Sequence, residues 1–217
     1  MSPVTDVWTD VHQERQALLE LLETLTPEQW DTPSLCTEWR VRDVVGHMVS
    51  ETQMTITQAA WGFVTSGFRI NRYIAKDARH RGAAPVAKLL EDFRSIVLAR
   101  TRLPGLSSLS MLEDIVIHQM DIRRPLERRR CIPYGRTILV AGDLWTNRFF
   151  PAPKLFQGIR ATATDADWSA GDGLDVAGSI EALVLTLAGR FAALDQLQGD
   201  GTALLRMRAD AQRAAMG

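Results

Sequence analysis

The chain has few of the features that mark secreted or membrane proteins. It contains only two cysteines, Cys36 and Cys131, too few for a disulfide framework or a four-cysteine zinc site. No apolar run approaches the roughly 18 residues that a membrane-spanning helix needs. Residues 1–6 lack the basic and apolar regions of a signal peptide. We therefore expect a cytoplasmic protein with no membrane partner.

An excess of charge of one sign is also absent. The 25 Lys and Arg residues are balanced by 26 Asp and Glu residues, which gives a net charge of −1. Proteins that bind nucleic acid usually carry a basic domain or patch, so we expect no nucleic-acid partner. Hydrophobic residues make up 46% of the 217 positions, which is enough to bury a core.

Apolar residues recur at helical spacing along the N-terminal part of the chain. The pattern predicts four helices, over residues 7–25, 41–63, 85–100 and 109–126. The segment 65–84 is rich in Arg and Lys and is expected to be a long connection. Such a connection lets the second and fourth helices face each other in a bundle. We predict a four-helix bundle for residues 1–130.

After Arg130 the pattern changes to a mixture of helices and strands. Strands are expected over 156–164 and from Val176 onward, on either side of a turn rich in Gly and Asp at 165–175. Helices are expected over 137–149, 180–197 and 202–214. Residues 131–217 are therefore predicted to be a small α+β region, and the whole chain to be mainly α.

Two of the predicted bundle helices carry residues that can bind a metal. Asp114 and His118 are four residues apart, so their side chains leave the same face of a helix and can reach one ion. His47, on another helix, would complete a site of three protein ligands with one position open, as in catalytic zinc sites. Spacing alone leaves a second interpretation, because Asp114, His118 and Asp121 also form a narrow stripe typical of a solvated helix face.

Two further carboxylates compete for roles at this site. Glu51, four residues after His47, is the alternative acidic ligand, but it is expected to point toward the apolar side of its helix. Asp121, one turn after His118, would either orient a ligand or pair with a nearby arginine. His12 and His80 are expected to be surface residues.

Ordered motifs along nearly the whole chain carry a family resemblance. Segments Leu25–Trp30 and Pro33–His47 resemble the N-terminal signature of the mycothiol-dependent maleylpyruvate isomerase family. The segment from Asp114 to Leu126 is similar to the family's second metal-binding segment. Residues 163–173, Leu187–Arg190 and the Leu197-x-Gly199 pattern resemble the C-terminal part of many members.

This resemblance implies a DinB-like four-helix bundle that binds one divalent metal, with zinc the expected ion, through His47, Asp114 and His118. It also implies mycothiol as a cosubstrate. The expected protein is an isomerase or thiol S-transferase acting on a small molecule, as a monomer or homodimer. The alternatives are a thiol-independent, metal-dependent hydrolase or lyase, and a non-catalytic protein that binds a metal or small molecule.

The C-terminal motifs supply the remaining candidates. Arg190, in the family-like Gly189–Arg190 pair, and Trp168 are expected to bind the cofactor, beside an open metal position that faces this region. Arg190 and Asp121 are secondary catalytic candidates. Because the reactive thiol is expected to belong to the cosubstrate, Cys36 is interpreted as a small buried residue.

Two positions depart from the family pattern. Asp114 stands where relatives often carry Glu, so the carboxylate is one methylene shorter. Arg40 stands where relatives often carry a Ser or Thr helix cap. The helix after it is therefore expected to be capped by Thr37 or to have no cap.

Overall fold

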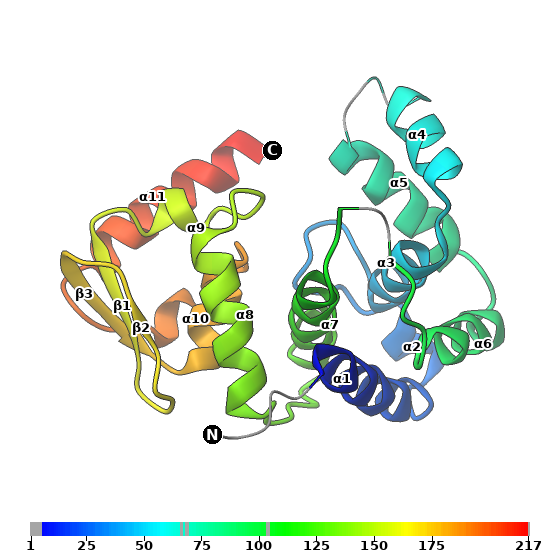
Figure 1. Cartoon of the computed structure of the whole chain (residues 1–217), viewed down its shortest axis with the longest axis horizontal. Helices are drawn as coiled ribbons and strands as arrows, with labels where there is room; N and C mark the ends of the chain where they lie inside the picture. Colours follow the sequence, from blue (N-terminus) through cyan, green and yellow to red (C-terminus); the bar gives the residue numbers. More distant parts are fainter. Residues whose placement is uncertain (1–5, 66, 68–69, 103–104, 217) are drawn as a thin grey trace. The chain divides into compact units, whose positions relative to one another are not determined.

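The computed structural model describes residues 6–65, 67, 70–102 and 105–216, in two compact units, Met1–Arg130 and Cys131–Gly217 (Figure 1). The predicted fold class is confirmed: mainly α, with a four-helix bundle followed by a small α+β part. None of the helices in the described ranges combines the length and the apolar character that crossing a bilayer demands. The expectation that the chain lacks a signal peptide was based largely on residues 1–5, which lie outside these ranges.

Four helices of the first unit form the bundle: α1 (Val7–Leu22), α3 (Val41–Gln53), α6 (Val86–Ile96) and α7 (Ser108–Arg123). Helices α1 and α3 each pack against both α6 and α7, which closes the ring of four. The interior is filled by fully buried apolar side chains such as Leu18, Val44, Phe93 and Leu112. The short helix α2 (Pro27–Trp30) packs against α3.

The second predicted helix is interrupted. Helix α3 ends at Gln53, and a separate helix, α4 (Ile56–Thr65), follows. Thr55 and Gln58 form a capping box: the Thr55 Oγ1 accepts from the Gln58 N–H at 3.3 Å, and the Gln58 Oε1 accepts from the Thr55 N–H at 2.9 Å. The prediction of one helix over 41–63 is therefore wrong at this turn.

The segment expected to be a connection contains another helix, α5 (Ile70–Gly82), which packs along α3. Two glycines make the close approach possible. A Cβ added to Gly46 would lie 2.9 Å from the Gly82 nitrogen and 3.0 Å from the Ala78 carbonyl oxygen. On the same helix pair, Ser50 Oγ donates to Asp77 Oδ2. These contacts fix α5 against the outer side of α3.

Helices α1 and α7 are joined by a buried polar network. Glu14 and Gln119 are both fully buried, and the Gln119 amide donates to the Glu14 carboxylate. Arg130 also contacts Glu14, and Arg123 donates to the Ala17 carbonyl oxygen at 2.7 Å. Buried polar groups need such partners, so this network holds the two helices in one register.

The second unit contains a three-stranded sheet of order β2-β1-β3. Strand β1 (Ile159–Ala163) is antiparallel to β2 (Ser169–Ala170) and parallel to β3 (Leu174–Gly178). Strand β2 lies within the segment expected to be a turn. The helices are α8 (Tyr134–Thr146), α9 (Ala152–Leu155), α10 (Ile180–Leu187), the 3-10 helix η1 (Phe191–Gln196) and α11 (Thr202–Met216).

The single helix predicted over 180–197 is also divided in two. Helix α10 is almost entirely buried and packs against α8. It ends before Gly189, whose φ of +79° is in the left-handed region that favours glycine, and η1 follows.

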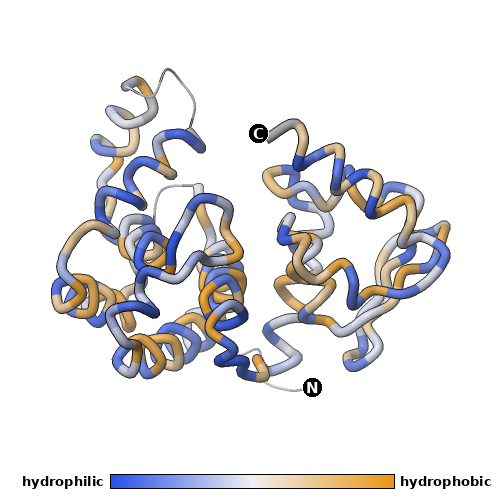
Figure 2. The backbone as a smooth tube through the Cα atoms, turned by 180° about the vertical axis from the view of Figure 1, so that it is seen from behind, coloured by the Kyte–Doolittle hydropathy of each residue, from blue (hydrophilic) through white to orange (hydrophobic). Residues whose placement is uncertain are grey.

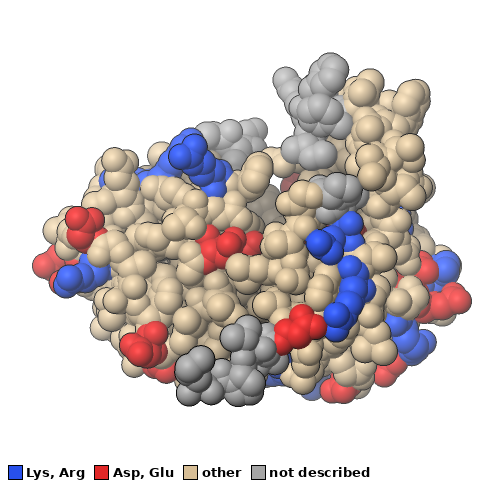
Figure 3. Space-filling model, viewed as in Figure 1, with Lys and Arg blue, Asp and Glu red and all other residues tan. Residues whose placement is uncertain are grey.

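In Figure 2, apolar and polar stretches alternate along the chain in both units. On the face in Figure 3, acidic and basic side chains lie in small groups of both signs.

Candidate metal centre

Helices α3 and α7 bring the three predicted ligands together. The Asp114 Oδ1 lies 3.3 Å from the His118 Nε2 and 3.6 Å from the His47 Nε2. The two imidazole rings have centroids 5.0 Å apart and stand edge to face, at 83°. All three side chains are largely buried, with exposed fractions of 10% for His47, 12% for Asp114 and 8% for His118. The solvated-face interpretation of this stripe is wrong.

The start of α3 differs from what the sequence suggested. Arg40 is the N-cap residue, and its backbone N–H donates to the Asp43 Oδ2 at 3.0 Å. The Arg40 guanidinium also contacts Asp43 and reaches Asp31 at 2.8 Å. Thr37 is not the cap, and the Arg40 side chain makes no cap hydrogen bond, as the uncapped alternative expected. Asp43 therefore fixes the first turn of the helix that carries His47.

The donor set fits a divalent metal ion. One ligand atom from each of His47, Asp114 and His118 lies within 4.8 Å of the other two. Bond lengths of about 2.0–2.2 Å place tetrahedral ligand atoms about 3.3–3.5 Å apart. The separations of 3.3 and 3.6 Å from Asp114 are close to this value. Two imidazoles and a carboxylate suit zinc, and they also suit iron, manganese or nickel.

Glu51 is a further acid at this centre, contrary to expectation. Its Oε1 lies 3.5 Å from the His47 Nε2, and its side chain is 24% exposed. The expectation that it points toward the apolar side of α3 is wrong. Burial, with a smaller contribution from the nearby Asp114 carboxylate, raises the pKa of Glu51 to about 7 against the opposing effect of the two histidines. Without a metal, Glu51 can therefore hold a proton near neutral pH.

Asp114 and Glu51 can be separated by a matched pair of amide variants. We expect Asp114→Asn to lose the metal and Glu51→Gln to retain it, because Asp114 lies near the Nε2 atoms of both histidines whereas Glu51 pairs with the Nε2 of His47 alone. Elemental analysis after dialysis measures the difference. Metal retained by Asp114→Asn and lost by Glu51→Gln would show that Glu51 is the ligand.

The Glu51→Gln variant should also change the pH dependence of folding in the metal-free protein. The folded-state pKa of Glu51, about 7, exceeds the ordinary value of 4.5, so its contribution to stability is lost as the pH rises through that interval. At pH 8 the variant should be more stable than the wild type, by up to about 3 kcal/mol. Below about pH 4 the difference should vanish. Urea unfolding at both pH values tests this, and equal stability at pH 8 would contradict it.

Asp121 contacts one of the candidate ligands. Its Oδ2 lies 2.9 Å from the His118 Nδ1, and the residue is fully buried. Of the two roles expected for Asp121, the structure shows the contact with the ligand. Burial lowers the pKa of His118, but the Asp114 and Asp121 carboxylates outweigh burial and raise this pKa well above its usual value. A proton held on Nδ1 by Asp121 leaves the Nε2 lone pair available for a metal.

The buried Arg15 places a positive charge near the carboxylates of Asp114 and Glu51. Arg15, on α1, donates to the carbonyl oxygens of Ile96 and Ala99 at 2.9 and 3.0 Å and to the Thr52 hydroxyl at 3.2 Å. Burial lowers the pKa of Arg15, whereas the carboxylates of Asp114 and Glu51 raise it. Its positive charge therefore offsets their negative charge. No periodic pattern along α1 indicates this role for Arg15.

Trp39 and Cys36, just before α3, lie beside the candidate ligands. The Trp39 ring centroid lies 5.0 Å from that of His47 and 6.2 Å from that of His118, so its apolar surface covers one side of both rings. Cys36 is half-buried, and its Sγ lies within 4.8 Å of ligand atoms of His118 and Asp121. Cys36 was expected to be a small buried residue, and it is only half-buried.

The two C-terminal candidates belong to the second unit. Trp168 packs edge to face against Trp145, with ring centroids 6.0 Å apart. Arg190 follows the turn at Gly189 and donates to the Ala188 carbonyl oxygen at 2.8 Å. The assignment of both residues to cofactor binding remains a prediction.

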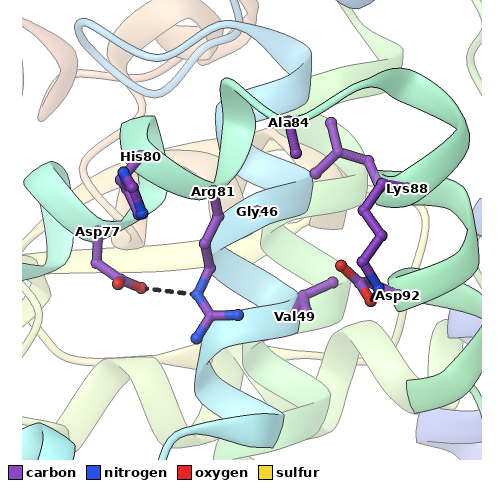
Figure 4. Close-up of a pocket in the computed structure, with 9 residues that line it drawn as sticks. Gly46, Val49, Asp77, His80, Arg81, Ala84, Lys88 and Asp92 are labelled. Atoms are coloured by element: carbon purple, nitrogen blue, oxygen red, sulfur yellow. Dashed lines mark hydrogen bonds and ion pairs between the residues drawn. The ribbon is translucent and has the colours of Figure 1, made fainter.

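A hollow of about 310 Å³ lies on the α5 and α6 side of α3 (Figure 4). Its charged side chains are paired with each other: Arg81 contacts Asp77 at 3.1 Å, and Lys88 contacts Asp92 at 2.6 Å. His80 also lines it and is exposed, as expected. None of the three clustered ligands lines this hollow, so we treat it as separate from the metal centre.

Comparison with known proteins supports the fold and the family. Residues 11–106, which include His47 but neither Asp114 nor His118, match the family described as the mycothiol maleylpyruvate isomerase N-terminal domain. Among curated proteins, none gives a significant match.

Two crystal structures are similar to the chain over 92% of its length and 94% of theirs. One is of the mycothiol-dependent maleylpyruvate isomerase, with 14% identity and a TM-score of 0.62. The other is of a variant of that isomerase with a histidine replaced by alanine, with 12% identity and a TM-score of 0.64. At these identities the likeness shows the fold, and it confirms the DinB-like bundle. The match of residues 11–106 to the mycothiol maleylpyruvate isomerase N-terminal domain family, together with this fold, confirms the resemblance that the motifs predicted.

Proposed function

We propose that the protein is a metal-dependent, mycothiol-using enzyme, an isomerase or thiol S-transferase, that acts on a small molecule. One observation carries the proposal. His47, Asp114 and His118 converge with separations that suit a divalent ion, in a chain whose N-terminal part matches a mycothiol maleylpyruvate isomerase family. The ion we propose is zinc.

The chemistry follows from the residues around these ligands. A divalent ion in this position would deprotonate a coordinating thiol at neutral pH. Asp121 holds the His118 ring in the required orientation, and Trp39 keeps water from one side of the two histidines. Glu51, with a pKa of about 7, can hold a proton beside His47, on the more exposed side of the ligand cluster. Arg15 limits the repulsion between the two acids.

Binding of mycothiol is the direct test. We expect the zinc-loaded protein to bind it with release of a proton, since the thiol loses its proton on coordination. Calorimetry in two buffers of different ionisation enthalpy should give heats that differ in proportion to the protons released. Binding without proton release, or no binding at millimolar concentration, would contradict the thiolate mechanism.

The same titration tests the C-terminal candidates. We propose that Arg190 and Trp168 contact the cosubstrate, so Arg190→Ala should weaken mycothiol binding while the metal content stays unchanged. Arg160→Ala is the matched control, because Arg160 is an exposed arginine in the same unit. Equal affinity for both variants would remove Arg190 from the proposal.

One observation favours a second candidate function. A carboxyl with a pKa near neutrality beside the metal ligands, as Glu51 has, also suits a general base that activates water. A hydrolase or lyase without a thiol would then use Glu51. In that case turnover of its substrate would require Glu51 and would proceed without mycothiol.

A further inference from the structure

We propose that Cys36, His118 and Asp121 form a second metal site that takes a soft, thiol-seeking cation and competes with the first site for His118. One ligand atom from each of the three residues lies within 4.8 Å of the other two, the same limit that the first cluster meets. The two clusters share only His118. The Cys36 site rests on its own residues, and only the competition rests on the proposed function.

The backbone holds Cys36 beside α7. It lies in the segment between α2 and α3, where the Leu35 N–H donates to the Asp121 carbonyl oxygen at 3.1 Å. The Cys36 N–H donates to the Ser34 hydroxyl, also at 3.1 Å. Both contacts fix the segment independently of any metal. Cys36 is half-buried, so the residue is not sealed inside the core.

The two nitrogens of His118 face different carboxylates. Its Nε2 lies 3.3 Å from the Asp114 Oδ1, and its Nδ1 lies 2.9 Å from the Asp121 Oδ2. In the first site, Nε2 is the ligand and the Nδ1 proton is donated to Asp121. In the second site, Nδ1 is the ligand. The ring proton is then on Nε2, which donates a hydrogen bond to Asp114. The neutral ring has only one proton to place, so occupation of one site disfavours the other.

The donors define the kind of ion. Thiolate is a soft ligand that selects ions such as cadmium and copper(I) over magnesium or calcium, whereas zinc is a borderline ion that accepts either donor set. When Cys36 binds, its thiol proton passes to the solvent, and the sulfur–metal bond forms without any oxidation or reduction. The first cluster has no sulfur donor. A thiolate-seeking ion should therefore prefer the Cys36 site.

Cadmium titration followed by ultraviolet spectroscopy tests the proposal, because a cadmium–thiolate bond absorbs and cadmium bound to nitrogen and oxygen does not. We expect the metal-free wild type to give this band and Cys36→Ser to lose it. Cys131→Ser, the matched control at the other, exposed cysteine, should keep it. No band in the wild type, or an unchanged band in Cys36→Ser, would overturn the proposal.

Two further variants separate this site from the first. His47→Ala, which lacks a first-site ligand, should keep the cadmium band, whereas His118→Ala should lose it. Cys36→Ser should still bind zinc, which shows that the variant folds and that the first site is intact. Manganese, which suits the first cluster but not a thiolate, should when loaded beforehand reduce the band in the wild type but not in His47→Ala. A full band with the manganese retained would overturn the competition for His118.

Discussion

Replacing His118 by alanine is expected to remove the metal and, with it, the catalytic activity. The substitution leaves His47 and Asp114 as the only ligands of the first site and leaves Asp121 without its imidazole partner. Loss of an outer-shell partner alone usually lowers metal affinity about 10- to 100-fold, and loss of a direct ligand should exceed this. After dialysis, elemental analysis should find almost no metal in the variant.

Thermal unfolding gives a second measurement of the same change. A ligand that binds only the folded state raises its stability, so added zinc should raise the melting temperature of the wild type but not that of His118→Ala. His80→Ala is the control, because His80 is an exposed histidine outside the cluster, and it should respond like the wild type. Full metal occupancy in His118→Ala would show that the ligand set is wrong.

The second large effect is expected from Arg15→Met. Methionine fills much of the space of the arginine stem, but it removes the guanidinium hydrogen bonds to the carbonyl oxygens of Ile96 and Ala99. It also removes the buried positive charge that faces Asp114 and Glu51. Losing one side of such a buried arrangement typically destabilises a protein by about 3–5 kcal/mol. Urea unfolding of the metal-free proteins should show this loss.

An exposed arginine provides the matched control for Arg15. Arg94 pairs with Glu23 at the surface, where both side chains are substantially exposed. Surface ion pairs contribute about 1 kcal/mol or less, so Arg94→Met should have a small effect. If the two variants lose equal stability, the buried position of Arg15 does not matter. If Arg15→Met also shifts the titration of Glu51 upward, its electrostatic role is supported.

The predictions from sequence succeeded where the signal was local and periodic. The Asp114 and His118 pair lies on one face of α7 because four residues complete about one helical turn. The same rule places Glu51 on the His47 face of α3, so the contact between them was available from the spacing. The capping box at Thr55 and Gln58 was also readable, and it would have predicted the break between α3 and α4.

Other features could not be predicted because they depend on contacts between distant segments. Cys36 reaches His118 only because the loop at Leu35 folds back onto Asp121. Arg15 approaches Asp114 and Glu51 only through the packing of the bundle. Helix α5 was missed because its many basic residues masked the short apolar face that packs on α3. Sequence spacing carries no information about contacts of this kind.

The contact between Gly46 and Gly82 offers an engineer a way to adjust the metal centre from outside it. A methyl group at position 46 would press on backbone atoms 2.9–3.0 Å away, which cannot swing aside as the end of a side chain can. Helix α3 would have to turn or shift, and the next residue along it is His47. Ions of different radius require different donor separations. Substitutions at this helix crossing would therefore retune the choice of ion while every ligand residue is kept.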